Sequence, residues 1–120
     1  MAKKPRKEEE GDLGVVTETR SKPKLKRPKL YKVIFHNDNY TTQEFVVSLL
    51  IEVFHKSESD AYAIMLHVHL RGAGIAGVYT YEVAEAKVDK SMKLAREAQY
   101  PLLVTMEPDD SDEEREGKDD

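Results

Sequence analysis

Three groups of residues in this sequence have types and spacings that chemistry uses. They are the histidine pair His67 and His69, the polar run His-Asn-Asp-Asn-Tyr at 36–40, and the glycines at 72, 74 and 77. The two histidines are two positions apart on a predicted helix, so their side chains point about 200° apart. Helices that bind zinc place two histidines four positions apart. The pair therefore does not predict a metal site.

A catalytic centre is not predicted either. The chain contains no cysteine, and no serine has the G-x-S-x-G context of an activated nucleophile. The three glycines fit the spacing G-x-G-x-x-G, but they follow a predicted helix and lead into a strand. A phosphate-binding loop has the opposite order, with the strand first and the helix last. We interpret the glycines as helix-ending and turn residues, and we expect a protein that is not an enzyme and has no cofactor.

The charges divide the chain into three parts. Residues 1–29 carry a net charge of +5, residues 30–107 of −3 and residues 108–120 of −6. The first and last parts lack hydrophobic periodicity, so we expect a flexible N-terminal extension, one folded core at 30–107 and an acidic disordered tail. Prolines stand among the basic residues of the extension, as in a linker, and the core is acidic. A nucleic-acid partner is therefore not expected.

Hydropathy and cysteine content also indicate the cellular compartment of the protein. No part of the chain has the run of about 20 apolar residues that a membrane span needs. The positive charges near the N-terminus are not followed by the apolar segment of a secretory signal. The lack of cysteine fits a reducing compartment. We expect a cytoplasmic protein with no membrane partner, and a monomer is the default.

The core begins with a strand and a helix. Residues 30–35 are rich in β-branched and aromatic side chains in an alternating pattern that is typical of a strand. The Asn and Asp residues at 37–39 favour a turn. Thr41 and, three positions later, Glu44 form a capping-box pattern, which predicts the start of a helix that ends near 55–56.

A second helix and a second strand follow. Ser57 is a favourable N-cap residue, and the apolar positions after it recur with the helical period. Gly72 and Gly74 predict the end of this helix, because glycine commonly follows a helix C-terminus. The apolar residues at 75–79 indicate the second strand.

The last two elements complete the fold prediction. Thr80 is expected to cap a third helix that runs to about Gln99, and the residues at 102–106 to form a third strand. The order β-α-α-β-α-β predicts an α+β fold. We expect a two-layer sandwich, in which a three-stranded antiparallel sheet carries three helices on one face.

Three separated segments of the core resemble the ClpS family of N-degron adaptors. In chain order they are LYKVIFHNDNYTTQEFVVSLL, IMLHVHLRGAGIAGVYTYEVAEAKV and YPLLVTME. The likeness covers residues 30–107 and implies the same β-α-α-β-α-β fold, which the C-terminal domain of the ribosomal stalk protein shares. It also implies an adaptor that binds the N-terminal Phe, Tyr, Trp or Leu of a protein. The adaptor delivers that protein to a ClpA- or ClpC-type AAA+ unfoldase of the Clp protease.

The resemblance implies three sets of functional residues. The positions that match the family's site for a free α-amino group are Asn37, Asp38, Asn39 and His69. The positions that match its pocket for the first side chain are Thr41, Gln43, Val46, Met65, Val68 and Leu102. The positions that match its unfoldase-facing surface, on the third helix, are Glu82 and Lys87. The family's N-terminal arm, which enters the unfoldase during delivery, corresponds to residues 1–29.

The implied site has a consistent chemistry. A terminal ammonium group has three donors and a positive charge, and a carboxylate, an amide oxygen and a neutral imidazole complement it. An acetylated or internal residue would leave these acceptors unpaired, at a cost of about 1–3 kcal/mol for each buried one. This sequence departs from the family at Asn39, which is commonly Asp, and at Gln43, which is often Met. We therefore expect weaker or altered selectivity among hydrophobic N-terminal residues.

The residues alone leave simpler interpretations open. The apolar positions of the implied pocket have the periodicity of ordinary core residues, and an Asn-Asp-Asn segment is commonly only a turn. The alternative function is a ribosomal-stalk-like interaction module without N-degron recognition, because a fold does not fix a function. Such a module has no use for Asn37, Asp38 and His69 together.

Overall fold

A computed structural model describes residues 27–110 of the chain. Most of the expected flexible extension and acidic tail falls on residues 1–26 and 111–120, which lie outside the described residues. The core expected from the sequence, 30–107, lies within them.

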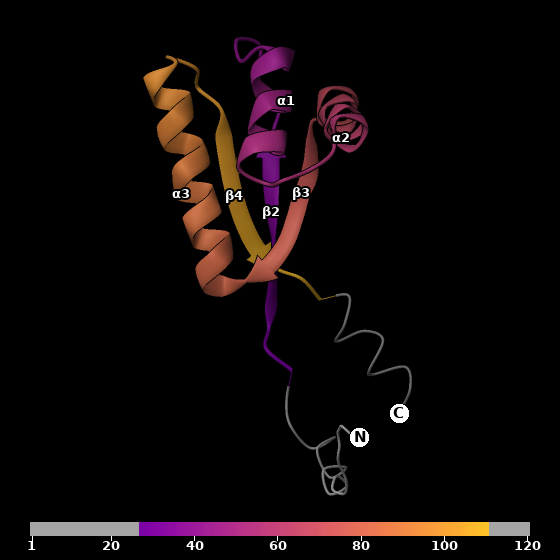
Figure 1. Ribbon diagram of the computed structural model, residues 1–120, viewed down its shortest axis with the longest axis vertical. Coiled ribbons are helices and arrows are strands. Elements are labelled where there is room, and N and C mark those ends of the chain that lie inside the picture. The colour runs from indigo at the N-terminus through magenta and orange to yellow at the C-terminus, as the bar shows by residue number, and fades with distance from the viewer. Residues whose placement is uncertain (1–26, 111–120) are drawn as a thin grey trace, which may run out of the picture.

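The three expected strands form one antiparallel sheet. They are β2 (Leu30–His36), β3 (Ala73–Thr80) and β4 (Leu103–Pro108), and β2 is the central strand (Figure 1). Successive side chains of a strand point to opposite faces of the sheet. In β2 this alternation buries Val33 and Phe35 completely beneath the helices. The period-two pattern of the sequence is thus the pattern of the sheet.

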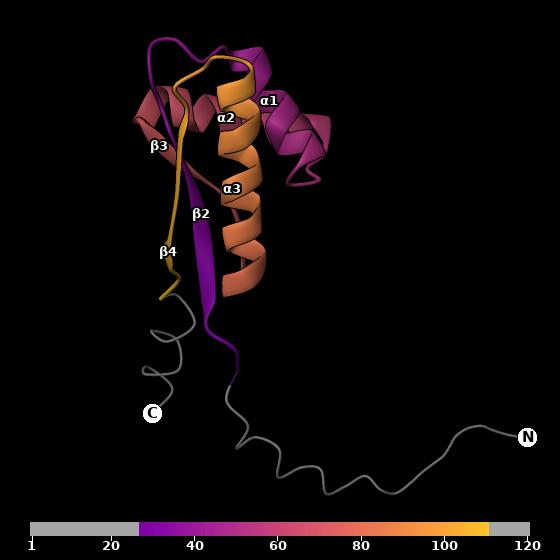
Figure 2. The ribbon, with the colours of Figure 1, turned by 90° about the vertical axis from the view of Figure 1, so that its left-hand side faces the viewer.

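Three helices cover this sheet. They are α1 (Gln43–Glu52), α2 (Glu58–Arg71) and α3 (Tyr81–Glu97). Figure 2 shows α1 and α3 on the same face of the sheet, and α2, seen almost end-on in Figure 1, lies across the strands beside β3. The predicted α+β fold and its element order are confirmed. None of the described helices is both long enough and apolar enough to cross a membrane.

The start of α1 differs from the prediction by one residue. The N-cap is Thr42 and not Thr41, because the Thr42 hydroxyl accepts a hydrogen bond from the backbone N–H of Phe45 at 3.1 Å. Glu44 consequently occupies the second helical position and is not the third-position partner of a capping box. Thr41 is engaged elsewhere, since its hydroxyl donates to the Asp38 carboxylate.

The end of α1 was predicted too late. The helix ends at Glu52, and His55 adopts a left-handed backbone conformation with a φ of 57°. The backbone N–H of Lys56 then donates to the carbonyl oxygen of Leu50 at 3.0 Å, which closes the helix end. A left-handed residue at this place is usually glycine, so the sequence carried no signal for it.

The caps of α2 agree with the prediction, apart from Gly74. Ser57 accepts from the backbone N–H of Asp60 at 3.1 Å, and Gly72 ends the helix with a φ of 94°. Gly74 does not end the helix, because β3 already begins at Ala73. A Cβ atom at Gly74 would lie 2.9 Å from a methyl group of Val68, so the glycine instead lets α2 pack closely on β3.

The last two elements are shifted by one or two residues. Thr80 is the N-cap residue of α3, but its side chain makes no capping hydrogen bond. The helix ends at Glu97, and Gln99 takes a left-handed conformation with a φ of 66°. The third strand occupies Leu103–Pro108 in place of 102–106, because its hydrogen-bonded register with β2 continues to Pro108.

Candidate functional site

The loop between β2 and α1 is organised by one carboxylate. Asp38 Oδ1 accepts hydrogen bonds from the backbone N–H groups of Tyr40 and Thr41, each at 2.7 Å. Its Oδ2 accepts from the Thr41 hydroxyl at 2.8 Å. An ionised carboxylate has about four acceptor positions, so about one remains. The Asn-Asp-Asn turn is therefore a built structure that holds a negative charge in place.

These hydrogen bonds also determine the ionisation of Asp38. Partial burial raises the pKa of its carboxyl group, but the donors from Thr41 and Tyr40 together outweigh burial and hold the pKa below its usual value. Asp38 is consequently ionised at neutral pH.

A single backbone hydrogen bond brings this loop to the end of α2. The N–H of Asn37 donates to the carbonyl oxygen of Gly72 at 2.9 Å. His69 lies in the last turn of α2, three residues before Gly72. The bond thus fixes the polar loop next to the histidine, although the two are more than 30 residues apart in sequence.

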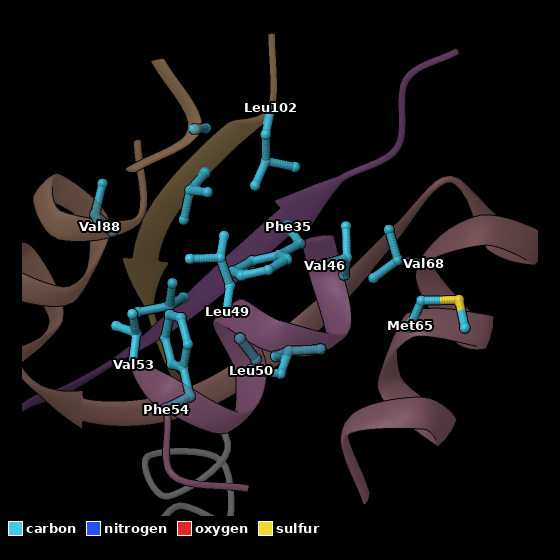
Figure 3. Packing of buried hydrophobic residues seen from close by; sticks show 14 of the residues in the cluster. Phe35, Val46, Leu49, Leu50, Val53, Phe54, Met65, Val68, Val88 and Leu102 are labelled. Carbon is cyan, nitrogen blue, oxygen red and sulfur yellow. The ribbon is translucent and has the colours of Figure 1, made fainter. Parts of the chain in front are cut away.

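The apolar side of the site comes from two helices. Val46 lies on α1, and Met65 and Val68 lie on the inner face of α2, each less than 10 % exposed. Figure 3 shows Val46 facing Val68, with Met65 beside them on α2. All three side chains belong to the main hydrophobic cluster, so the wall that they form is part of the core.

Polar loop and apolar wall enclose one cavity of about 360 Å³. Nine of the ten positions that the sequence analysis assigned to amino-group binding or to the side-chain pocket line it, namely Asn37, Asp38, Asn39, Thr41, Gln43, Val46, Met65, Val68 and His69. Leu102 does not line it. It is buried in the hydrophobic cluster beyond Phe35, on the β4 side (Figure 3).

Comparison with known proteins decides the family. A sequence model of the ATP-dependent Clp protease adaptor protein ClpS matches residues 26–105, about two thirds of the chain. The chain belongs to the ClpS family. The resemblance read from the sequence is confirmed, and with it membership of a family of adaptors.

Individual relatives are similar over most of their length. The ClpS adapter protein of Myxococcus xanthus is 59% identical over 101 residues, which cover 84% of this chain and 94% of that protein. The ClpS adapter protein of Parvibaculum lavamentivorans is 52% identical over 102 residues, which cover 85% of this chain and 93% of that protein. Among solved structures, Agrobacterium tumefaciens ClpS2 bound to L-phenylalaninamide matches with a TM-score of 0.67. It is 41% identical, with 69% of this chain and 100% of that chain covered.

Two residues that line the cavity in this ClpS-family chain received no binding role from the sequence, although one of them belongs to the polar run at 36–40. They are Tyr40, which is 75% exposed, and Thr42, the N-cap of α1. Both flank predicted positions, so their proximity in sequence was the available signal. Within residues 27–110, no group of three or more His, Cys, Asp and Glu residues has an arrangement that would hold a metal ion.

The two residues that match the family's unfoldase-facing surface are in different environments. Glu82 is exposed in the first turn of α3. Lys87 is half-buried, and its Nζ donates to the carbonyl oxygen of Val53 at 2.6 Å. The ammonium group also lies 5.6 Å and 5.2 Å from the ring centroids of Phe54 and Tyr79. Lys87 therefore joins α3 to the end of α1, a role that the sequence did not indicate.

Proposed function

We propose that this chain is a non-catalytic adaptor that binds the free N-terminal residue of a protein, when that residue is Phe, Tyr, Trp or Leu. It presents the protein to a ClpA- or ClpC-type AAA+ unfoldase of the Clp protease. The observation that carries the proposal is the single cavity in which an acidic polar loop and a histidine face an apolar wall. Family membership supplies the adaptor role.

The polar part of the cavity suits an ammonium group. Asp38 provides a fixed negative charge with about one acceptor position left, because three of its four are used within the loop. Asn37 can add an amide oxygen and neutral His69 a ring nitrogen. Asn39 lines the same cavity. Three acceptors around three N–H donors would pair a terminal amine completely, whereas an acetylated terminus has one donor and no charge.

The apolar part suits one large side chain. Val46, Met65 and Val68 present aliphatic and thioether groups, and sulfur makes favourable contacts with aromatic rings. Full burial of a Leu or Phe side chain contributes about 1.5–3 kcal/mol. Added to the amine contacts and reduced by the cost of association, this gives a micromolar affinity, about −8 kcal/mol. A micromolar affinity suits an adaptor that must release the bound protein again.

A solved relative supports this assignment. L-phenylalaninamide, the molecule bound to Agrobacterium tumefaciens ClpS2, combines a free amine with an aromatic side chain. Those are the two features for which the cavity of this chain offers complementary groups. We propose that Gln43 and Thr41 form the rim of the pocket and that Leu102 supports it from the core.

The delivery function is assigned to other parts of the chain. We propose that the exposed Glu82 contacts the unfoldase and that Lys87 contributes there with the donors left beyond its bond to Val53. Residues 1–29, with a net charge of +5, are proposed as the arm that the unfoldase engages.

The direct test is a binding measurement with matched peptides. A peptide that begins with phenylalanine should bind with micromolar affinity when its amine is free, and about 100-fold more weakly when it is acetylated. Isothermal titration calorimetry with the full chain measures both. Equal affinities for the two peptides would refute the proposal, because a site built for an ammonium group must discriminate between them.

A further inference from the structure

A second apolar groove of about 430 Å³ lies between α1 and α2. It is not part of the cavity described above, although it adjoins it. Its lining residues are Gln43, Glu44, Val47, Ser48, Ile51, Tyr62 and Met65. Five of them come from successive turns of α1, so the groove follows that helix away from the polar loop.

The groove and the cavity share two residues. Gln43 and Met65 line both, one from the start of α1 and the other from α2. The groove and the cavity are therefore direct neighbours. A peptide whose first residue occupies the cavity can continue past Gln43 into the groove, because an extended chain advances about 3.3 Å per residue.

Most of the surface that lines the groove is apolar, and the serine in it already has a hydrogen-bond partner. Val47 and Ile51 line the groove and are partly buried, and Tyr62, which also lines it, is 55% exposed. The Ser48 hydroxyl donates to the carbonyl oxygen of Phe45 at 2.8 Å, so it requires no partner from a ligand. An exposed tyrosine beside aliphatic side chains is a surface that an apolar ligand group covers favourably.

One charge lies at the end of the groove nearest the cavity. Glu44 is exposed in the first turn of α1 and lines the groove together with Gln43. A carboxylate at this place attracts a cationic side chain. The groove thus offers apolar contact and a negative charge to the same ligand.

We propose that this groove is a subsite for the residues that follow the first residue of a bound protein. The groove binds an apolar side chain at the third or fourth residue of the bound protein. Glu44 favours a lysine or arginine next to that residue. The inference rests on the proposed function, because only a peptide anchored in the cavity enters the groove in this register. The groove would then select among proteins that share one N-terminal residue.

The test distinguishes binding in the cavity from binding in the groove by the size of the ligand. L-phenylalaninamide reaches the cavity alone, whereas a free peptide that begins with phenylalanine also reaches the groove. In a series of glycine peptides headed by phenylalanine, one leucine is moved through positions two, three and four. We expect the full chain to bind the best member about five- to tenfold more tightly than the all-glycine peptide. A lysine beside that leucine should strengthen binding further.

Three variants locate the effect. Tyr62→Ser should abolish the leucine preference and leave the affinity for L-phenylalaninamide unchanged. Glu44→Gln should remove only the additional preference for lysine. Tyr81→Ser is the matched control, because Tyr81 is 50% exposed on α3 and lines neither hollow, and it should change none of these affinities.

The outcomes distinguish the two proposals. If the wild-type chain does not bind L-phenylalaninamide, the proposed function fails and this subsite with it. If the chain binds that ligand but shows the same affinity for all members of the peptide series, the subsite alone is refuted. If Tyr62→Ser binds every peptide normally but loses delivery to the unfoldase, the groove belongs to the unfoldase contact, and the subsite is likewise refuted.

Discussion

At the scale of single residues, Asp38 has two tasks that cooperate. It receives three hydrogen bonds that shape the loop, and the same bonds keep it ionised beside the cavity. A carboxylate that was only a ligand contact would be free to turn away, whereas this one is held by its own loop. Shape and charge of the polar side of the site therefore depend on one side chain.

The first prediction concerns the stability that Asp38 contributes. Its pKa is lowered on folding, so its contribution is complete above the unfolded-state pKa of about 3.9 and is lost as the pH falls through the folded-state value. Asp38→Asn should lower the free energy of unfolding by about 1 kcal/mol at pH 7, and this loss should shrink as the pH falls below about 3.9. Urea unfolding at pH 7 and along a series of acidic pH values measures this. The exposed Asp89→Asn serves as control, and a loss for Asp38→Asn that stays the same at every pH would contradict the prediction.

The second prediction uses the two neighbouring histidines. His69 lines the cavity, whereas His67 lines a different hollow beside β3. If His69 accepts a hydrogen bond from the bound amine, His69→Ala should weaken binding of L-phenylalaninamide about ten- to 100-fold, because the amine loses a partner worth about 1–3 kcal/mol. His67→Ala is the matched control and should bind like the wild type. Isothermal titration calorimetry measures both variants, and an unchanged affinity of His69→Ala would show that this histidine does not contact the amine.

The third prediction concerns Gln43, an exposed polar residue that lines the cavity and is proposed to form its rim. Gln43→Met, combined with Asn39→Asp, adds apolar contact at the rim and one negative charge near the amine. We expect binding of peptides with N-terminal Phe or Leu to tighten by about three- to tenfold. Fluorescence anisotropy with peptides that differ only in their first residue tests this, and an unchanged strength and ranking would refute it.

At the scale of elements, the helices meet through contacts that no local pattern encodes. Lys87 connects α3 to the carboxyl end of α1 by a hydrogen bond to Val53, and its ammonium group lies over the rings of Phe54 and Tyr79. These contacts fix α1, which carries Val46 into the cavity. Lys87, which is proposed to contact the unfoldase, is thus also a link within the fold.

The fourth prediction separates these roles of Lys87. Lys87→Met keeps most of the apolar length but removes the donor and the charge, so the free energy of unfolding should fall by about 1–2 kcal/mol. Lys90→Met, on the exposed side of the same helix, should change it by less than about 0.5 kcal/mol. Thermal unfolding measures both variants. If Lys87→Met is as stable as the wild type, the observed contacts contribute nothing and Lys87 acts only on partners.

The element boundaries show how far local sequence reasoning reaches. The existence and order of all six elements followed from periodicity and from caps such as Ser57 and Gly72. The ends of α1 and α3 were placed too late, because the left-handed residues that end them are His55 and Gln99 and not glycines. The expected cap at Thr41 was wrong because Asp38 engages that hydroxyl and leaves the capping to Thr42.

The site was predictable only in part for a related reason. Periodicity placed Val46, Met65 and Val68 on inner helix faces, but a core position and a pocket wall have the same periodicity. The resemblance to a family separated the two. What places the loop beside His69 is the bond from Asn37 to Gly72, a long-range contact that spacing cannot reveal.

At the scale of the whole molecule, the cavity and the two ends of the described segment, residues 27 and 110, lie at opposite ends of the sheet. The cavity loop follows His36, whereas at the other end of β2 Tyr31 pairs with Pro108 and Leu30 accepts a hydrogen bond from Asp109 at 2.8 Å. In Figure 1 the described chain begins and ends at the bottom, and the loop lies at the top. Recognition and the connection to the extension are therefore separated by the length of β2.

The fifth prediction follows from this separation. A chain that lacks residues 1–26 should bind L-phenylalaninamide with an affinity within about twofold of the full chain, because distant changes are additive. The same chain should fail to deliver a bound protein to the unfoldase. Calorimetry and a degradation assay measure the two properties. A large loss of affinity on truncation would show that the extension reaches the cavity after all.

The position of β2 has a mechanical consequence for delivery. If the unfoldase pulls on residues 1–29, as proposed, the force enters the fold at the beginning of the central strand. Seven residue pairs with β3 and six with β4 hold that strand on its two sides. A central strand that is pulled along its axis must break the hydrogen bonds to both neighbours together, whereas an edge strand is held on one side alone. An adaptor that is pulled from this end should therefore resist unfolding better than one whose first strand lies at the edge of its sheet.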